Sequence, residues 1–493
     1  MIRRVVLAVA AVIAVVGPTS SAVAATVTVS PTGAITTIQG GIDAAVAGDT
    51  VLVKAGTYRE NVTISAKAGL VLKAKGKVIL DARPNGATGS GSAITIASSD
   101  TVVVEGFTIQ HAASDGMGDL GRGVISTGSI GVTVRKCTFI DCADFAVQIT
   151  GVSARVDNCK VLGGGGGVNV IGNGFSVTKT TVREVDDDGI RVNGLLGLVQ
   201  SCTIAGTSAG QGIHLTGQGC VVEKCLVTRT TSEGLLVSND GNLVQKNVFR
   251  DIEDQGINAL SADQTQVLSN TITGTLNEAI LIDGADAIVQ KNKLSEFGTA
   301  GIAVEGSTFT ITQNTVSSGG VNTTGISVST ATGGGTIEKN SISDVRDGGI
   351  VVEATAGMTQ VTKNVVQRCG TTNSSGIRVA GNAVVVDGNK VKDGVGDGIA
   401  ISSDSVLVQN NVVTNNGLDG IDVDSIGADG TQLVANSVTG NGAEGIENNG
   451  VNTVCTNNVA KNNRTDVGND GMFLTFTGNV FLTGGSGFVP EID

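Results

Sequence analysis

The stretch from Asn270 to Asn292 reads NTITGTLNEAILIDGADAIVQKN, and the chain repeats this arrangement along most of its length. An Asn opens the unit, the small–aliphatic pair Ala279-Ile280 follows about ten residues later, and a second Asn opens the next unit. Segments in which apolar and polar residues alternate, such as Thr271-Ile272-Thr273, are typical of half-buried β-strands. Each unit therefore predicts at least two short strands separated by turns.

Both features of this unit recur in register. The small–aliphatic pair advances from residue 123 to residue 445 in fourteen steps, which gives a mean spacing of 23 residues. The pairs are Gly123-Val124, Ala146-Val147, Gly167-Val168, Gly189-Ile190, Gly212-Ile213, Gly234-Leu235, Gly256-Ile257, Ala279-Ile280, Gly301-Ile302, Gly325-Ile326, Gly349-Ile350, Gly376-Ile377, Gly398-Ile399, Gly420-Ile421 and Gly445-Ile446. The second column is Cys137, Cys159, Thr180, Cys202, Cys225, Asn247, Asn270, Asn292, Asn314, Asn340, Asn364, Asn389, Asn411, Asn436 and Asn457.

This regularity predicts an all-β solenoid. A unit of 22 to 27 residues cannot bury its apolar face alone, whereas stacked units bury it continuously. We expect a single-stranded parallel β-helix of about sixteen coils, which at ~4.8 Å per coil is a rod on the order of 75 Å long. Stacked Asn carboxamides can hydrogen-bond along such a rod.

The N-terminus predicts export. Arg3-Arg4 precede an apolar stretch, Val5 to Val16, that is too short to span a bilayer, and Ala22-Val23-Ala24 fits a signal peptidase site. We expect residues 1–24 to be a signal peptide and the mature protein to be secreted, periplasmic or at the cell surface. No later apolar run is long enough for a membrane span. The remaining divisions are residues 25–100, an N-terminal cap with the first coils; 101–480, the β-helix repeats; and 481–493, a C-terminal cap or tail.

Composition supports the fold and excludes one partner class. The chain has 72 Gly, 4 Pro, one Tyr and no Trp, which favours short strands and tight turns over helices. A formal charge of −13 disfavours nucleic acid, because phosphate binding requires a basic surface.

The first hundred mature residues carry a family resemblance. Ile38, Ile42 and Ala45 fall on one face of a short predicted helix that would cap the first coil. This helix, the strand Gly48-Asp49-Thr50-Val51, the segment Gly56-Thr57-Tyr58-Arg59-Glu60-Asn61-Val62 and Gly106-Phe107-Thr108-Ile109 together resemble the pectate-lyase-like superfamily of right-handed parallel β-helix proteins. The resemblance implies right-handed coiling. It implies no single activity, because the superfamily contains lyases, hydrolases, esterases, epimerases and non-catalytic proteins.

The best candidate site lies on the strand after Gly189. If Ile190 and Val192 point inward, Arg191 and Asn193 point outward, and equivalent positions on neighbouring coils carry further polar residues. We expect Asp187, Asp188, Arg191 and His214 to be catalytic candidates that could transfer protons and stabilise charge on an anionic sugar. The candidate substrate-binding residues are Gln148, Asn169, Asn193, Gln211, Glu233 and His111. The alternative is a set of solvated residues with one surface ion pair of little energetic value.

Neighbouring features leave the activity open. His111 lies in an irregular loop, Gln110 to Gly121, which could shape a groove or be a plain turn insertion. Polygalacturonases of the superfamily carry paired acids and a Gly-His-Gly on the next coil; Asp187-Asp188 matches the acids loosely, but Gln211 replaces the His. Hydrolysis therefore ranks low. Lyase chemistry would need an Arg or Lys base with calcium-binding Asp residues, and Asp186 to Asp188 with Arg191 provide these residue types.

A second acidic group predicts a possible cation site. Asp422 and Asp424 are expected to face outward on one strand close to Asp419, with Glu444 and Glu447 on the next coil. Asp422, Asp424 and Glu447 are the candidate Ca²⁺ ligands, because Ca²⁺ prefers carboxylate oxygens. Acidic residues on an acidic protein are otherwise simply solvated.

Eight Cys in an exported protein would ordinarily suggest disulfides. Four of them fall in the Asn column, which favours free thiols that fill the turn stack, although Cys137 with Cys159 and Cys202 with Cys225 stand on adjacent coils where disulfides remain the alternative.

Two function classes follow. The first is an exported protein that binds extracellular carbohydrate, such as a polysaccharide or cell-surface glycan, or another cell-surface partner. The second is a polysaccharide lyase, hydrolase or epimerase that acts on an acidic polysaccharide. The absence of Trp and the regular coil lengths favour the first, because sugar-binding clefts use aromatic rings and long loops.

Overall fold

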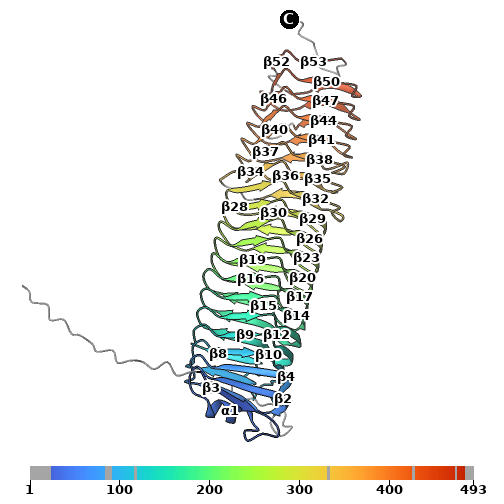
Figure 1. Ribbon diagram of the computed structural model, residues 1–493. Coiled ribbons are helices and arrows are strands. Elements are labelled where there is room, and N and C mark those ends of the chain that lie inside the picture. Colours follow the sequence, from blue (N-terminus) through green and yellow to red (C-terminus); the bar gives the residue numbers. More distant parts are fainter. Residues whose placement is uncertain are drawn as a thin grey trace, which may run out of the picture.

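The computed structural model describes residues 24–83, 91–115, 119–329, 333–424, 428–471 and 475–482. These residues form a rod of about 20 turns with parallel strands stacked along its axis (Figure 1). The predicted all-β, right-handed parallel β-helix is confirmed. The predicted signal peptide, except Ala24, and the predicted tail beyond residue 482 lie outside the described residues.

Each regular turn contains three strands. One turn consists of β13 (Ser176–Thr178), β14 (Thr181–Val185) and β15 (Ile190–Asn193). Each pairs in parallel with its equivalent in the next turn, namely β16 (Leu198–Gln200), β17 (Thr203–Thr207) and β18 (Ile213–Leu215). Three strand stacks therefore run along the rod, and we call them the β13, β14 and β15 sheets.

The small–aliphatic pair is explained by packing inside the rod. Ile190 and its equivalents, such as Ile213 and Ile257, are completely buried. A Cβ atom at Gly189 would lie 2.5 Å from Ile204 Cγ2 and 2.6 Å from the carbonyl oxygen of Gly212. Only a small residue fits there, because the next turn approaches so closely.

The predicted Asn column forms a buried ladder. Asn292 Nδ2 donates to the carbonyl oxygen of Val267 (2.8 Å) and to Asn314 Oδ1 (3.0 Å), while Asn292 Oδ1 accepts from the backbone N–H of Asn270 (2.8 Å). The bonds link each turn to the next and satisfy buried polar groups.

One member of the predicted column was wrong. The ladder continues from Asn436 to Asn458, not Asn457, and Asn458 then bonds to Asn479. Asn457 has a φ of 56° and occupies the left-handed turn position just before the ladder. Two consecutive Asn residues made this register ambiguous from sequence.

All eight cysteines are buried free thiols, so the structure contains no disulfide among them. Burial raises the pKa of Cys137 to about 11 and that of Cys142 to about 12, and both thiols are therefore protonated at neutral pH. The expectation that the thiols act as small packing groups is confirmed.

The N-terminal end is capped as expected. Helix α1 (Ile38–Ala44) begins after Thr37, whose hydroxyl accepts from the N–H of Gly40 at 3.1 Å, and packs on β1 (Thr26–Val29) and β2 (Thr50–Arg59). The first turns use long strands such as β2 and β4 (Val71–Asp81), and their strands β3 (Val62–Ser65) and β5 (Ile94–Ala97) come before Gly123-Val124, the first predicted small–aliphatic pair. The predicted number of coils was too low for this reason. Within the described ranges, no helix is long and apolar enough to cross a membrane.

Candidate functional site

Four predicted polar residues form one row on the outer face of the β15 sheet. Strands β10 (Thr138–Thr150), β12 (Lys160–Ile171), β15 and β18 are paired in parallel. The register places Gln148, Asn169, Arg191 and His214 side by side, and Leu236 of β21 (Leu235–Val237) follows them. Strand alternation and repeat spacing together predict such a row.

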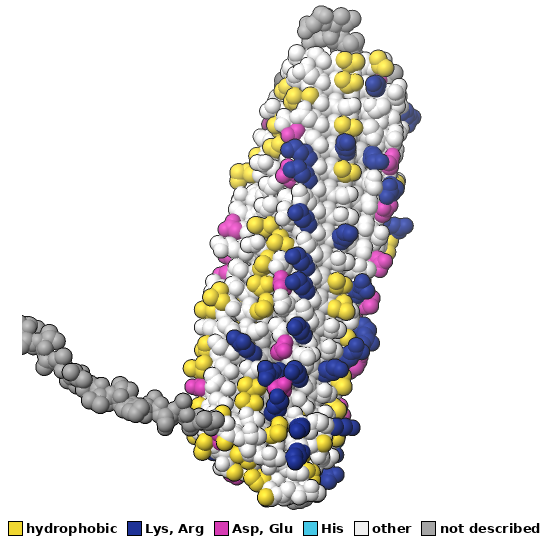
Figure 2. All heavy atoms as spheres, viewed as in Figure 1, with side chains coloured by type: hydrophobic (Ala, Val, Ile, Leu, Met, Phe, Trp, Pro, Cys, Tyr) yellow, Lys and Arg dark blue, Asp and Glu magenta, His cyan; other side chains and the backbone are white. Residues whose placement is uncertain are grey.

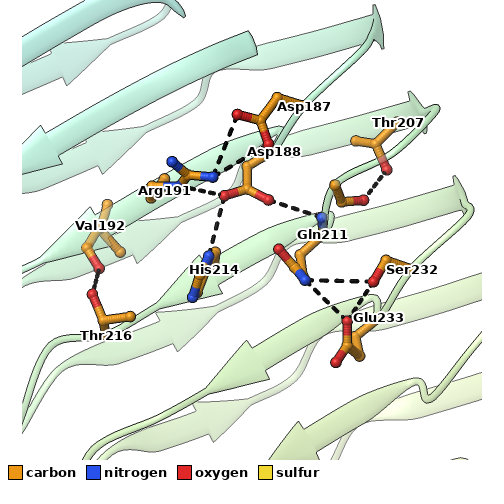
Figure 3. Close-up of polar contacts among 11 residues, drawn as sticks. Asp187, Asp188, Arg191, Val192, Thr207, Gln211, His214, Thr216, Ser232 and Glu233 are labelled. Atoms are coloured by element: carbon orange, nitrogen blue, oxygen red, sulfur yellow. Dashed lines mark hydrogen bonds and ion pairs between the residues drawn. The ribbon is translucent and has the colours of Figure 1, made fainter.

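Asp188 joins the guanidinium of Arg191 and the imidazole of His214 in this row. Its Oδ2 accepts from Arg191 Nε at 2.5 Å and lies 3.2 Å from His214 Nδ1, while its Oδ1 accepts from the backbone N–H of Gln211 at 2.9 Å (Figure 3). An ionised carboxylate only accepts hydrogen bonds, so this arrangement requires the proton on Nδ1 of His214. No described contact occupies Nε2 of His214.

Hydrogen bonds offset the cost of burying the Asp188 carboxylate. Burial by itself raises the pKa of Asp188, but the hydrogen bonds from His214 and Arg191 outweigh it, and the pKa lies below its usual value. Arg191 also contacts Asp187 (3.2 Å) and lies over the ring of Phe145, with 5.2 Å from Cζ to the ring centroid. We name Asp187, Asp188, Arg191 and His214 the Arg191 cluster.

Exposure separates the roles of these residues. The Asp188 side chain is completely buried, whereas the side chains of Arg191 and His214 are 37% and 23% exposed. Asp188 therefore holds Arg191 and His214 in place from beneath the surface. A direct part of Asp188 in catalysis stays a prediction.

A polar network extends from the cluster onto the next turns. Gln211 Nε2 donates to Glu233 Oε2 at 3.1 Å, and Glu233 also accepts from Ser232 at 2.5 Å and from Asn258 at 3.4 Å. Beside the cluster, a hollow of about 330 Å³ is lined by residues that include Asp186, Ser208 and Arg229. The surface at this point is thus both polar and indented.

Sequence reasoning missed a second pair on the same sheet. Arg122 Nη2 contacts Asp144 at 2.8 Å, and its Nε donates to Gln148 at 2.8 Å. Arg122 immediately precedes Gly123, as Asp188 precedes Gly189. A charged residue directly before the small residue of the repeat is the sequence feature that could have identified Arg122.

Two predicted residues are not brought into the cluster. Asn193 is exposed at the end of β15, and no described side-chain contact joins it to Arg191 or His214. His111 follows β7 (Thr108–Gln110), three turns away, and its Nδ1 lies 3.3 Å from Asp81. Asp81 also pairs with Arg83 at 2.9 Å, and these hydrogen bonds lower the pKa of Asp81 to about 2.

The second acidic group gathers near the other end of the same sheet. Carboxylate oxygens of Asp419, Glu444 and Glu447 lie within 4.8 Å of one another and could hold one hard cation. Asp422 of β45 (Ile421–Val423) lies in register with Glu447 of β48 (Glu444–Asn448). Of the predicted ligands, Glu447 belongs to the set of three, Asp422 lies beside it, and Asp424 is not part of the set.

Among the described residues, no Lys, Arg or His forms an ion pair with these carboxyl groups. Burial, together with the neighbouring Glu444 and Glu447, raises the pKa of Asp419 to about 8, and burial with Asp397 and Glu447 raises that of Asp422 to about 7. We name Asp419, Asp422, Glu444 and Glu447 the Asp419 cluster.

The family of the chain follows from its repeats. The model of the right-handed β-helix region matches residues 45–184, 145–281, 188–331 and 278–436. These overlapping matches cover residues 45 to 436, well over half of the chain. The protein belongs to this family of right-handed β-helix proteins.

Several solved structures are similar to this chain at low identity. Pectate lyase Pel9A is 15% identical, with a TM-score of 0.41 over 55% of this chain and 80% of that chain. The PL6 family alginate lyase AlyGC is 10% identical, with a TM-score of 0.36 over 93% and 100%. The GH136 lacto-N-biosidase from Eubacterium ramulus is 11% identical, with a TM-score of 0.39 over 57% of this chain and 64% of that chain. The comparison with curated proteins gave no match.

Proposed function

We propose that this protein binds an acidic polysaccharide across the outer face of the β15 sheet, with the Arg191 cluster as the point of recognition. The observation that carries the proposal is the arrangement around Asp188. A fully buried carboxylate holds one guanidinium and one imidazole, and both remain partly exposed. A guanidinium fixed in this way is suited to a sugar carboxylate, because it loses little side-chain entropy on binding.

The row also provides neutral hydrogen-bonding groups for sugar hydroxyls. Gln148 is half-buried on the same face before Arg191, and the half-buried Gln211 follows it, whereas Asn169 between Gln148 and Arg191 is buried. Successive strands lie ~4.8 Å apart, so a linear glycan along the axis would pass a polar position on each of the four turns from Gln148 to His214. Polysaccharides with a carboxylate on each sugar are therefore the preferred ligand class.

Polysaccharide lyase or epimerase activity is the second candidate function, and one observation favours it. Nδ1 of His214 is held by Asp188, which leaves Nε2 to accept a proton from a bound sugar. Arg191 beside it could stabilise negative charge that develops on the sugar carboxylate. Glycoside hydrolysis is less well supported, because it needs two carboxyl groups near the bond, and Asp188 is buried while Asp187 is paired with Arg191.

The test combines binding with product analysis. Oligosaccharides of pectate, alginate and a glycosaminoglycan would be titrated into the wild type and into Arg191→Gln. The matched control is Arg378→Gln, because Arg378 is an ion-paired arginine in the same outward row, on β39 (Ile377–Val379), but lies eight turns away from the Arg191 cluster. We expect Arg191→Gln to weaken binding at least ~10-fold, which is the loss of one charge-assisted contact, and Arg378→Gln to have no effect.

Equal affinities for the two variants would contradict the binding proposal. Turnover separates the two functions: if unsaturated or epimerised products form, His214→Ala should lower their rate by ~10² or more and leave binding largely intact. If no products form with any of these polysaccharides, the protein is a binder.

We also propose that the protein acts outside the cytoplasm, on the basis of the N-terminal residues 1–24. Material recovered from the periplasm or medium should begin near Ala25. An intact N-terminus in cytoplasmic material would contradict export.

A further inference from the structure

Two columns of turn residues run along this rod and carry opposite charges. Both consist of residues with a left-handed backbone, at equivalent places in successive turns. The first column lies between the β13-type and β14-type strands. The second lies at the end of the β14-type segment, before the β15-type strand: Glu184 is the penultimate residue of β14, whereas Asp344 directly follows β35 (Ser341–Ser343). Left-handed positions favour Gly, Asn and Asp, so any other residue there needs a further reason.

Lysine dominates the first column. The hydrogen bond from each turn residue to the next turn defines its order, and the eleven positions from Lys136 to Lys363 include seven lysines with φ between 50° and 58°. These residues, which we name the lysine column, are Lys136, Lys179, Lys224, Lys246, Lys291, Lys339 and Lys363. None of the seventeen equivalent positions from Gly106 to Gly478 is acidic.

The second column has the opposite composition. It contains six acidic residues, Asp141, Glu184, Asp251, Glu296, Asp344 and Asp393. Its two arginines, Arg229 and Arg368, are paired with Glu184 and Asp344 of the same column at 2.9 and 2.7 Å. The backbone requirement is the same in both columns, so it does not explain why one is basic and the other acidic.

The lysine column is a straight and exposed array. Figure 2 shows Lys and Arg side chains gathered in a file along the rod. All seven lysines are exposed, and the ten turn-to-turn steps between the first and the last correspond to about 48 Å. Each backbone is fixed to the next turn, as in the bond from the Lys246 N–H to the carbonyl oxygen of Leu268 at 3.0 Å, so the spacing of the charges is set by the fold.

Part of this charge is available to a ligand. Lys136, Lys224, Lys339 and Lys363 pair with Glu105, Glu223 and Glu338. Lys179, Lys246 and Lys291 form no ion pair with any carboxylate of the described residues. The protein as a whole has a charge of −13, so this line of cations is a local exception.

We infer that the lysine column binds a long, linear acidic polysaccharide that lies parallel to the rod axis. Regularly spaced cations match a regularly spaced polyanion, and many weak contacts on one rigid edge add up to high avidity. Amide side chains flank the column at the ends of the adjacent strands. Gln200 and Gln245 donate to Glu223 and Gln290 donates to Thr312, so their amide oxygens are the groups that can accept from sugar hydroxyls. The column is separate from the Arg191 cluster, which lies on the third side of each turn.

The test compares two triple variants of the full chain. Lys179→Gln, Lys246→Gln and Lys291→Gln together remove the three unpaired charges. Gln313 already occupies this column with a φ of 59°, so glutamine is compatible with the backbone. The control combines Arg183→Gln, Arg250→Gln and Lys461→Gln, which remove the same charge from exposed positions about 13 Å away at the far end of the β14-type strands. At physiological ionic strength this exceeds the screening length of ~8 Å.

Binding of long polygalacturonate would be measured at several salt concentrations. We expect the lysine variant to bind ~10- to 100-fold more weakly, with a shallower salt dependence, and the control to bind within about twofold of the wild type. A short oligomer cannot span the column, so its affinity should be unchanged by the lysine variant and reduced by Arg191→Gln. This difference separates failure of the present inference from failure of the proposed function.

Three results would overturn the inference. The first is that wild-type protein does not retain long polygalacturonate at physiological salt. The second is that the control variant loses as much affinity as the lysine variant, which would show an effect of net charge alone. The third is that a DNA duplex binds more tightly than the polysaccharide at equal salt, which would assign the edge to nucleic acid.

Discussion

Asp188 and Asp419 occupy the same place in the repeat and have opposite acid–base behaviour. Each is a buried residue just before the glycine that opens a strand of the β15 sheet. Three residues later, Arg191 follows the first and Asp422 follows the second, and the next turn adds His214 or Glu447 in the same row. The pKa of Asp188 is lowered, whereas that of Asp419 is raised to about 8.

This position buries the carboxyl group in both cases, so the neighbouring side chains determine whether its pKa is raised or lowered. Burial raises the pKa of both carboxyl groups, but of the two only Asp188 receives hydrogen bonds from an arginine and a histidine, Arg191 and His214. One fold position thus holds a carboxylate paired with Arg191 at one place and a carboxyl group among other acids at another.

Replacing Asp188 or Asp419 by Asn should have the largest effects on the free energy of unfolding, and the two effects should differ. Asp188→Asn should destabilise the protein by about 2 kcal/mol, because Arg191 and His214 lose their buried partner, although their partial exposure limits the cost. Asp419→Asn at pH 8 should be neutral or slightly stabilising, because it removes an uncompensated charge. Chemical denaturation of both variants at pH 8 would measure this, and equal destabilisation would contradict the comparison.

The pH dependence of stability should differ between the region around Asp188 and the region around Asp419. The folded-state pKa of Asp419 is about 8 and that of Asp422 about 7, so the folded state holds protons that the unfolded state releases above pH ~4. Stability near residue 419 should fall as pH rises from 4 to 8, by on the order of 1–2 kcal/mol after solvent screening. Asp188 has a lowered pKa, so its contribution is present above pH ~4 and is lost below it.

Hydrogen exchange corrected for its intrinsic pH dependence would resolve the two regions. Protection of peptides that cover residues 419–447 should decline between pH 5 and pH 8, while protection of residues 188–214 should not. The same profile in both regions would show that the neighbouring charges do not matter.

A substitution at Asp422 tests whether the neighbouring charge controls the pKa of Asp419. Asp422→Arg places a guanidinium where Arg191 stands relative to Asp188, and it should return the pKa of Asp419 toward its usual range. We expect the alkaline loss of protection near residue 419 to fall by at least half. Persistence of the full loss would mean that burial alone controls Asp419.

Calcium should have the smallest effect on stability, and only in the region around Asp419. At a free Ca²⁺ concentration of about ten times the dissociation constant, binding by Asp419, Glu444 and Glu447 would raise the free energy of unfolding by about 1.4 kcal/mol. Protection near residue 419 should increase at pH 8 in the wild type and stay unchanged in Glu447→Gln. An equal response of the variant would argue against a specific site.

The fold was predictable because its cause is local and repeated. The small–aliphatic pair recurs because successive turns approach closely at positions such as Gly189. The Asn column recurs because its side chains form a hydrogen-bonded ladder, as Asn292 does. Register and strand alternation also predict the row of Gln148, Asn169, Arg191 and His214.

The interactions within the site were less predictable. The complete burial of Asp188 and the pairing of His111 with Asp81 depend on side chains that meet across 26 and 30 residues. Repeat spacing places such residues on adjacent turns but does not show which atoms meet. The contact between Arg122 and Asp144 was missed because Arg122 comes directly after the irregular loop.

The most direct test of the account is calorimetric titration of one acidic oligosaccharide into the wild type, Arg191→Gln and Asp422→Asn. If the Arg191 cluster is the recognition site, Arg191→Gln should weaken binding at least ~10-fold, while Asp422→Asn on the same outward row should bind as the wild type does. Undiminished binding by Arg191→Gln, or an equal loss in Asp422→Asn, would contradict the central claim.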